Sequence, residues 1–287
     1  MFSSIIGHQN VCSVLSRQIE TGQMAHAYLF VGPEGVGKSA VTSEFIGTLV
    51  PSGTDATKVA RNFDEKTEKL KSSISVEQIR ELRERLSLTS FDGSKKMVFI
   101  EEADYLSDSA ANALLKTLEE PRGDTCIILR AETVESVAET IASRCQILRF
   151  HLVPEKIIRD ALRTRGLEQE EAMKIATMSR GRPGVALRLI RDGAYRAQRE
   201  TAHATFQTIM SSSLPKRLGL VASLLPKTET DKSSALEKIL DTWEEVARDR
   251  MLDGDSRFTP ILDRIRESRE AMEFNINPQL ALEHVVI

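Results

Sequence analysis

Residues 32–39 constrain the fold of this chain more than any other feature. They read Gly-Pro-Glu-Gly-Val-Gly-Lys-Ser, which is the spacing of a phosphate-binding loop, or P-loop. Before the loop, residues 27–31 form an apolar run that predicts a buried strand, and residues 39–49 predict a helix. The N-terminus of that helix would face the phosphates. This strand–loop–helix order disfavours the alternative, a chance match in a glycine-rich turn.

Five residues of the P-loop have expected roles in holding ATP or ADP. Gly32, Gly35 and Gly37 let the backbone turn so that its N–H groups point at the β-phosphate. Lys38 can reach the β- and γ-phosphates, and the Ser39 hydroxyl can ligate Mg²⁺. We therefore predict a nucleotide site at this loop, with Mg²⁺ as its metal.

A second nucleotide-binding element is expected where a buried strand ends in acidic residues. Residues 97–100, Met-Val-Phe-Ile, favour a strand, and Glu101 and Glu102 follow directly. Glu101 would lie near the metal, and Glu102 would polarise the attacking water. Glutamate is one methylene longer than the aspartate more common at the first position, which changes the geometry offered to the metal. The alternative is a solvated acidic loop, which the upstream P-loop disfavours.

The composition is that of an ordinary soluble protein. The chain has 287 residues, of which 41% are hydrophobic and 28% charged, enough for two or three domains. No apolar stretch approaches the length of a membrane span, and the N-terminus lacks the features of a secretory signal. The net charge of −3 argues against a strongly basic nucleic-acid-binding protein but leaves a local basic patch open.

The cysteines indicate a reducing compartment. Cys12, Cys126 and Cys145 are scattered and form neither a disulfide framework nor a CxxC metal pair. We therefore expect a cytoplasmic location and no membrane partner.

Strand and helix patterns alternate over the first 150 residues, which predicts an α/β fold with a parallel sheet and helices on both faces. Strands are expected at 126–129 and 146–150, and helices within 5–25 and at 74–88, 107–118 and 134–141. We predict three domains: a P-loop domain at 1–152, a small helical lid at 153–193 and an all-α C-terminal domain at 194–287, with a polar break at 227–232. Segment 51–73 is polar and charge-rich, has few apolar anchors and is the weakest candidate for order in the first half of the chain.

Five segments point to a known family. They are His-Ala-Tyr-Leu-Phe at 26–30, Ile-Ser-Val-Glu-Gln-Ile-Arg at 74–80, Asn-Ala-Leu-Leu-Lys-Thr-Leu-Glu-Glu-Pro at 112–121, Ser-Arg-Cys at 143–145 and Asn-Ile-Asn-Pro-Gln-Leu-Ala-Leu-Glu at 275–283. With them the chain resembles, over nearly its whole length, the delta-prime family of clamp-loader subunits of bacterial DNA polymerase III, which are AAA+ proteins. The segments at 112–121 and 143–145 are highly specific to clamp-loader subunits, whereas the P-loop alone is not.

The resemblance implies an AAA+ P-loop domain, a lid and a C-terminal collar that anchors a ring of subunits. The implied partners are the gamma/tau-type ATPase and delta subunits, with the sliding clamp and primed DNA reached through the complex. Arg144 would act in trans as an arginine finger on a neighbouring ATPase, an effect worth on the order of 10³ or more in rate. The alternative is that Arg144 caps the preceding helix or forms a surface ion pair.

Departures from the AAA+ pattern bear on hydrolysis and on metals. The position that senses the γ-phosphate falls near Ala131 and Glu132, where alanine cannot donate a hydrogen bond and glutamate would repel phosphate. The lid position that carries an arginine in active subunits is Gly184, and Arg182 lies two residues earlier. Segment 51–73 has none of the four zinc-binding cysteines of many relatives, so no zinc site is expected. We therefore expect nucleotide binding with weak or absent hydrolysis.

Three other functions are weighed against a structural clamp-loader subunit. An active gamma-type clamp-loader ATPase is disfavoured by Ala131, Glu132, Gly184 and the missing cysteines. An AAA+ homohexameric helicase or remodelling ATPase should keep its sensors and carry pore or DNA-contacting elements. A simple P-loop kinase would need an acceptor site that is not evident. We therefore predict a delta-prime-type subunit that helps to load the sliding clamp onto primed DNA in chromosomal replication.

Overall fold

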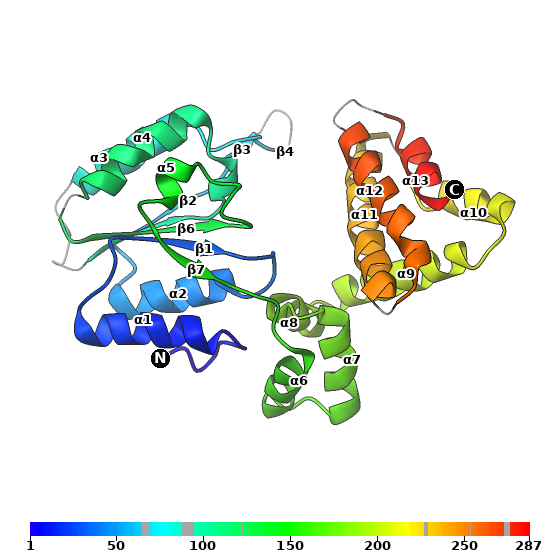
Figure 1. Ribbon diagram of the computed structural model, residues 1–287, viewed down its shortest axis with the longest axis horizontal. Helices are drawn as coiled ribbons and strands as arrows, with labels where there is room; N and C mark the ends of the chain where they lie inside the picture. The colour runs from blue at the N-terminus through cyan, green and yellow to red at the C-terminus, as the bar shows by residue number, and fades with distance from the viewer. Residues whose placement is uncertain (65–68, 88–94, 122, 227–228, 253, 273–275) are drawn as a thin grey trace. The chain divides into compact units, whose positions relative to one another are not determined.

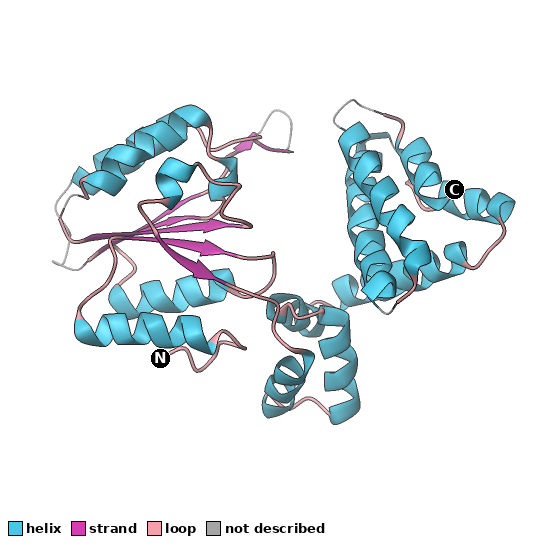
Figure 2. Ribbon diagram, in the orientation of Figure 1, coloured by secondary structure: helices cyan, strands magenta, loops and turns pink. Residues whose placement is uncertain are grey.

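The computed structural model shows two compact units, Met1–Leu187 and Arg188–Ile287 (Figure 1). The structure describes residues 1–64, 69–87, 95–121, 123–226, 229–252, 254–272 and 276–287. The first unit is α/β and the second is helical (Figure 2). The domain boundaries predicted at 152/153 and 193/194 stay predictions.

A five-stranded parallel sheet forms the centre of the first unit. In spatial order its strands are β2 (Ala56–Val59), β5 (Lys96–Ile100), β6 (Thr125–Ala131), β1 (Ala27–Val31) and β7 (Gln146–Arg149). Every residue of β1 is buried, as expected for an inner parallel strand that is covered on both faces. The parallel sheet predicted from the sequence is confirmed, as are its strands β1, β5, β6 and β7.

Helices cover both faces of the sheet (Figure 1). They are α1 (Gln9–Thr21) and α2 (Lys38–Leu49) on one face, and α3 (Val76–Ser87), α4 (Asp108–Glu119) and α5 (Glu139–Ala142) on the other. Alternate residues of β1 divide between two cores, because successive side chains of a strand point to opposite faces. Tyr28 and Phe30 pack with Val41 and Phe45 of the first layer. Leu29 packs with residues of the second layer, including Leu114.

The polar segment 51–73 contributes an edge strand that the sequence pattern did not predict. β2 (Ala56–Val59) pairs with β5, and only Val59 in it is buried. An edge strand with one buried side chain has no apolar run or alternation, so it escapes a search by pattern. A short hairpin follows, formed by β3 (Phe63–Asp64) and β4 (Lys69–Leu70). Residues 65–68 of this segment lie outside the described residues.

The prediction of a helix at 134–141 is wrong over most of that range. Helix α5 begins only at Glu139 and ends at Ala142. Upstream, the Thr133 hydroxyl accepts a hydrogen bond from the Ser136 N–H at 3.2 Å, and the Ser136 hydroxyl donates to the Thr133 carbonyl at 2.9 Å. Such local side-chain bonds compete with helical ones. The chain therefore turns before the helix starts.

Three helices follow the sheet: α6 (Glu155–Thr164), α7 (Gln169–Ser179) and α8 (Pro183–Arg191). Ile158 and Leu162 of α6 and Ile175 of α7 are fully buried. Proline at the first helical position suits the start of α8, because its missing N–H would have no partner there. The boundary between the two compact units falls inside α8.

The second unit is built from helices around one apolar core. They are α9 (Gly193–Met210), α10 (Leu214–Ala222), α11 (Glu229–Leu252), the short η2 (Ser256–Phe258), α12 (Thr259–Met272) and α13 (Pro278–Val286). The rings of Phe206 and Trp243 lie 5.2 Å apart in this core. The break predicted at 227–232 is wrong from Glu229 onward, because helix α11 already starts there. Residues 227–228 lie outside the described residues.

The segment at 275–283 contains the start of the last helix. The Asn277 side chain accepts from the Gln279 N–H at 2.9 Å and caps α13, with Pro278 at its first position. Asn275 lies outside the described residues. No helix within the described stretches is long and apolar enough to cross a membrane.

Candidate nucleotide site

The P-loop connects β1 to α2 in a backbone conformation that favours glycine. Gly32, Gly35 and Gly37 have φ angles of +149°, +77° and +119°. At Gly32, a Cβ would lie 2.1 Å from the Phe150 carbonyl oxygen, so a side chain at this position is excluded. The loop thus has the glycine-dependent turn that the sequence predicts at this place.

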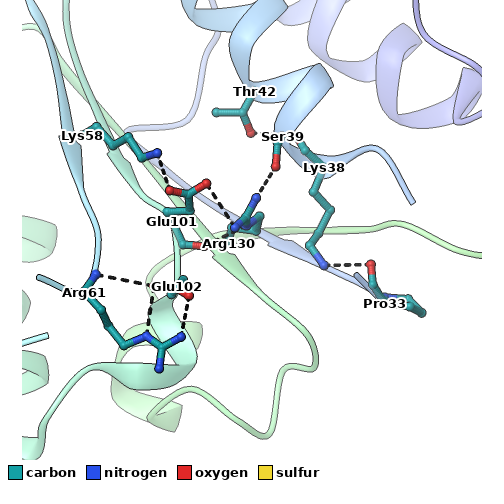
Figure 3. A network of polar contacts seen from close by, with 9 residues as sticks. All are labelled: Pro33, Lys38, Ser39, Thr42, Lys58, Arg61, Glu101, Glu102 and Arg130. Atoms are coloured by element: carbon teal, nitrogen blue, oxygen red, sulfur yellow. Dashed lines mark hydrogen bonds and ion pairs between the residues drawn. The ribbon is translucent and has the colours of Figure 1, made fainter. Parts of the chain in front are cut away.

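Lys38 is buried, with 6% of its surface exposed, and its ammonium lies against the loop itself (Figure 3). Its Nζ donates to the Pro33 carbonyl at 3.0 Å and also to the Gly32 carbonyl. Burial, and next the positive charge of Arg130, lower the pKa of Lys38 to about 8. The lysine is therefore positioned in the loop and loses its proton more readily than an exposed lysine.

The acidic pair at the end of β5 is neutralised by basic side chains (Figure 3). Glu101 forms an ion pair with Lys58, from the edge strand β2. Glu102 receives a bidentate pair from Arg61, with Nε to Oε2 at 3.1 Å and Nη2 to Oε1 at 2.8 Å. The Arg61 guanidinium also lies 3.8 Å from the centre of the Tyr105 ring. The hydrogen bonds from Arg61 hold the pKa of Glu102 below its usual value.

Arg130 joins the two residues predicted to ligate Mg²⁺. Its Nε donates to the Glu101 backbone carbonyl at 2.7 Å, and its Nη2 lies 3.3 Å from Glu101 Oε1. Its Nη1 donates to the Ser39 hydroxyl. In this arrangement both predicted ligands accept from a guanidinium, and a dication between them would face that positive charge. Ser39 and Glu101, as they are placed, do not fit a magnesium ion.

Sequence reasoning missed Lys58, Arg61 and Arg130. All three are basic residues near strands of the parallel sheet: Lys58 lies in β2, Arg61 follows it and Arg130 lies in β6. The sequence offered one signal for Arg130, because this basic residue directly precedes Ala131, where the γ-phosphate-sensing position was expected. Lys58 and Arg61 could not be recognised, because the strand β2 was itself not predicted.

The two positions expected to sense the γ-phosphate have structural roles. Ala131 is buried at the end of β6. The Glu132 carbonyl accepts from the Gly32 N–H at 2.9 Å, and the Glu132 N–H donates to Asp104 Oδ1 at 3.0 Å. These bonds tie the end of β6 to the start of the P-loop. Alanine offers no polar side chain, and the two Glu132 bonds are made by its backbone.

The start of α8 packs directly on the P-loop. The Gly184 N–H donates to the Gly35 carbonyl at 2.8 Å. A Cβ at position 184 would lie 2.8 Å from that same carbonyl oxygen, so the close approach requires glycine. Active subunits carry an arginine at this lid position, and an arginine at position 184 would not fit while Gly184 lies this close to Gly35. Arg182 and Val185 both border Gly35, since a Cβ built there would lie 3.5 Å and 3.1 Å from their side chains.

His8 holds the P-loop from another side. Its Nε2 donates to the Val36 carbonyl at 2.8 Å, and its ring lies 4.9 Å from that of Phe150. Burial lowers the pKa of His8, which favours the neutral ring in this contact. The P-loop is therefore fixed by contacts from the N-terminal segment and from the first residues of α8.

Arg144 lies in the turn between α5 and β7 and is bonded within its own unit. Its Nη2 donates to Glu119 Oε1 at 2.6 Å, and its Nη1 donates to the Thr140 carbonyl at 2.9 Å. About a third of the side chain, 36%, is exposed. No contact among the described residues joins Arg144 to the cluster in Figure 3. Its predicted role in trans stays a prediction.

Cysteine and metal chemistry offer no alternative site in the described part of the chain. No group of three His, Cys, Asp or Glu side chains among those residues could hold a metal ion. The three cysteines are free. Burial raises the pKa of Cys126 and of Cys145 to about 12, which disfavours their thiolates.

The parallel sheet, the P-loop and the helices after the sheet define an AAA+ fold. A gamma-subunit-related protein of DNA polymerase III from Thermotoga maritima has the same fold, with a TM-score of 0.53 and 18% identity over 96% of each chain. A point mutant of RuvB from Thermotoga maritima also matches, with a TM-score of 0.53 and 19% identity over 80% of this chain and 85% of RuvB.

Sequence comparison narrows the class to one family. The family model described as "DNA polymerase III, delta subunit" matches residues 7–154. The delta-prime subunit of DNA polymerase III from Bacillus subtilis is 25% identical over 96% of this chain and 94% of its own. That of Haemophilus influenzae is 36% identical over 42% of this chain and 37% of its own. The chain therefore belongs to the DNA polymerase III delta subunit family, as a delta-prime-type clamp-loader subunit.

Proposed function

We propose that this chain joins gamma/tau-type ATPase subunits and a delta subunit in a clamp loader, where it binds a nucleotide and scarcely hydrolyses it. The sliding clamp and primed DNA are reached through the complex. Relatives named tau support these partners: the tau subunit from Salmonella typhimurium is 28% identical over 84% of this chain and 38% of its own. The helices of 194–287 are the proposed collar by which the subunit is anchored.

The bidentate pair between Arg61 and Glu102 carries the proposal of weak hydrolysis. A carboxylate that activates water must attract its proton, and the two hydrogen bonds from Arg61 hold the pKa of Glu102 below its usual value, which makes it a weaker base. The pair is also partly buried, with 18% and 25% of the two side chains exposed, so water competes poorly for it. Ala131 and Glu132 add no donor for a γ-phosphate.

The nucleotide-binding half of the proposal rests on the P-loop. Its glycines have the required backbone angles, and Lys38 lies in the loop with a positive side chain. Its hydrogen bonds to Gly32 and Pro33 are with backbone carbonyls, which a phosphate can replace as a partner. A phosphate is fully charged and the carbonyls are neutral dipoles, so the ammonium of Lys38 would form the stronger hydrogen bond with the phosphate.

Arg144 is the proposed contribution to a neighbouring ATPase site. The turn between α5 and β7 sets its backbone, and its side chain is partly exposed. The ion pair with Glu119 and the hydrogen bond to the Thr140 carbonyl hold the Arg144 guanidinium while no phosphate is near. In a ring, the γ-phosphate of the neighbour would compete with Glu119 for the same guanidinium.

The test is reconstitution with gamma/tau-type and delta subunits, followed by ATPase and clamp-loading assays with and without primed DNA. We expect this chain to be required for loading and to contribute little turnover of its own. Light scattering on the isolated chain separates the alternatives. A homohexamer that forms on addition of ATP would favour a helicase or remodelling ATPase, and fast turnover by the isolated chain would favour an active gamma-type subunit.

A further inference from the structure

The guanidinium of Arg130 lies at the point where a P-loop site normally needs a cation. Figure 3 shows it between Ser39, at the start of α2, and Glu101, at the end of β5. Its backbone is fixed in β6, directly opposite Phe30 of the strand that leads into the P-loop. Three of its nitrogens are engaged: Nε and Nη2 by Glu101, and Nη1 by Ser39.

Several contacts together fix the position of the Arg130 side chain. The Nε bond of 2.7 Å is to a backbone carbonyl, which does not move without the strand. The guanidinium carbon also lies 5.8 Å from the centre of the Phe99 ring, and 21% of the side chain is exposed. A lone surface arginine would have a choice of rotamers, whereas the Arg130 side chain is held by the end of β5 and by the start of α2.

Magnesium and Arg130 would compete for the same oxygens. Mg²⁺ requires near-octahedral geometry with oxygens at about 2.0–2.1 Å. The Ser39 hydroxyl and the Glu101 carboxylate both accept from Arg130, and Lys58 takes the other oxygen of Glu101. A guanidinium, by contrast, suits phosphate oxygens, to which it donates two parallel hydrogen bonds.

We propose that Arg130 replaces the magnesium ion at this P-loop, so that the chain holds a nucleoside di- or triphosphate without a divalent cation. Arg130 remains bonded to Glu101 and turns the N–H groups now given to Ser39 toward the β-phosphate, beside Lys38. This inference rests on the proposed nucleotide binding and names its cofactor requirement. It also accounts for an intact P-loop beside acidic residues that are neutralised by the chain's own cations.

The experiment is a titration of the full chain with a fluorescent ADP analogue, in excess MgCl₂ and in excess EDTA. For the native sequence the two dissociation constants should agree within about threefold. Arg130→Ala frees Ser39 and Glu101 for the metal, so its affinity in EDTA should fall at least about tenfold and recover in MgCl₂. Arg149→Ala is the matched control. Arg149 is an exposed arginine of β7, which pairs with β1 as the Arg130 strand does, and its removal should introduce no magnesium dependence.

A second pair of variants keeps the test decisive. Arg130→Met retains the aliphatic stem beside Phe99 and replaces Arg130→Ala if that variant unfolds. With Arg130 in place, Ser39→Ala should bind nucleotide with the same affinity in EDTA and in MgCl₂. Combined with the Arg130 substitution, Ser39→Ala should abolish the recovery of affinity in MgCl₂.

Each result decides the question. A native chain that loses about tenfold or more of its affinity in EDTA overturns the inference and leaves nucleotide binding intact. A native chain that binds nucleotide only after Arg130 is removed also overturns it, because the arginine would then block the site. Absence of binding by every variant overturns the proposed nucleotide binding together with this inference, while membership of the clamp loader is decided separately by reconstitution.

Discussion

Arg144 and Glu119 are joined by an ion pair, with 2.6 Å between Nη2 and Oε1. The pair links the two segments most specific to clamp-loader subunits, because Glu119 lies in 112–121 and Arg144 in 143–145. A purely structural role predicts that removing either partner has the same effect. A role in trans predicts that only the arginine matters to a neighbour. Substitutions at Arg144 and at Glu119 therefore distinguish the two roles.

Arg144→Ala should leave this chain folded and able to join the complex, since no buried apolar group is removed. The change in unfolding free energy should stay within about 0.5 kcal/mol, as for other partly exposed pairs. Total ATP hydrolysis by the reconstituted loader, measured with clamp and primed DNA, should fall partially because one neighbouring site loses its finger. Arg144→Lys should not restore it, since an ammonium cannot donate in a planar fork. Clamp loading at the native rate by the alanine variant would leave Arg144 as a structural residue.

Glu119→Gln is the matched substitution on the other side of the pair. It removes the negative charge that competes with phosphate for Arg144 and keeps a hydrogen-bond acceptor near it. Stimulated ATP hydrolysis by the loader should therefore stay at the native level or rise. If the glutamine variant loses as much activity as Arg144→Ala, the ion pair itself is what the complex needs, and the finger hypothesis is wrong.

Lys38→Ala should abolish nucleotide binding by the isolated chain, because it removes the one side-chain cation within the P-loop. Equilibrium titration measures this loss, and the native chain should turn ATP over more slowly than about 1 s⁻¹. Assembly with the other subunits, followed by gel filtration, should be largely unchanged. A variant that fails to assemble would mean that the nucleotide is a structural component of the ring.

Nucleotide affinity should fall as the pH rises above about 8. The pKa of Lys38 is lowered to about 8 by burial and by Arg130, and a bound phosphate favours the protonated amine. Below that pH the lysine is already charged, so binding is insensitive to its titration. Above it, binding must take up a proton. Calorimetry at pH 8.5 in two buffers of different ionisation enthalpy should detect the uptake, and equal heats in both would contradict the assignment.

Gly184→Arg should weaken the packing of α8 on the P-loop. Its Cβ would lie 2.8 Å from the Gly35 carbonyl oxygen, and the backbone hydrogen bond between these residues would have to lengthen. We expect a loss of about 1–3 kcal/mol in the free energy of unfolding, measured by urea denaturation. Gly47→Arg is the control, because Gly47 lies within α2 with open space around it. Equal stability of the two variants would show that α8 is not held at the P-loop.

Patterns within short stretches of sequence predicted most of the fold. The P-loop was recognisable because its glycines, Lys38 and Ser39 are contiguous, and the inner strands were recognisable because burial on both faces makes them apolar runs. The helices α3 and α4 followed from the spacing of their buried residues. The edge strand β2 escaped, since an edge strand that buries one side chain carries no such pattern.

The chemistry at the P-loop was decided by tertiary structure alone. Ser39, Glu101 and Arg130 are far apart in the sequence and meet because neighbouring parallel strands bring their carboxyl ends to one edge of the sheet. The sequence by itself determined that a P-loop and acidic residues are present. Only the fold decided that a guanidinium, and not open space for a metal, lies between them, because periodicity specifies which face a residue occupies and not which partner it meets there.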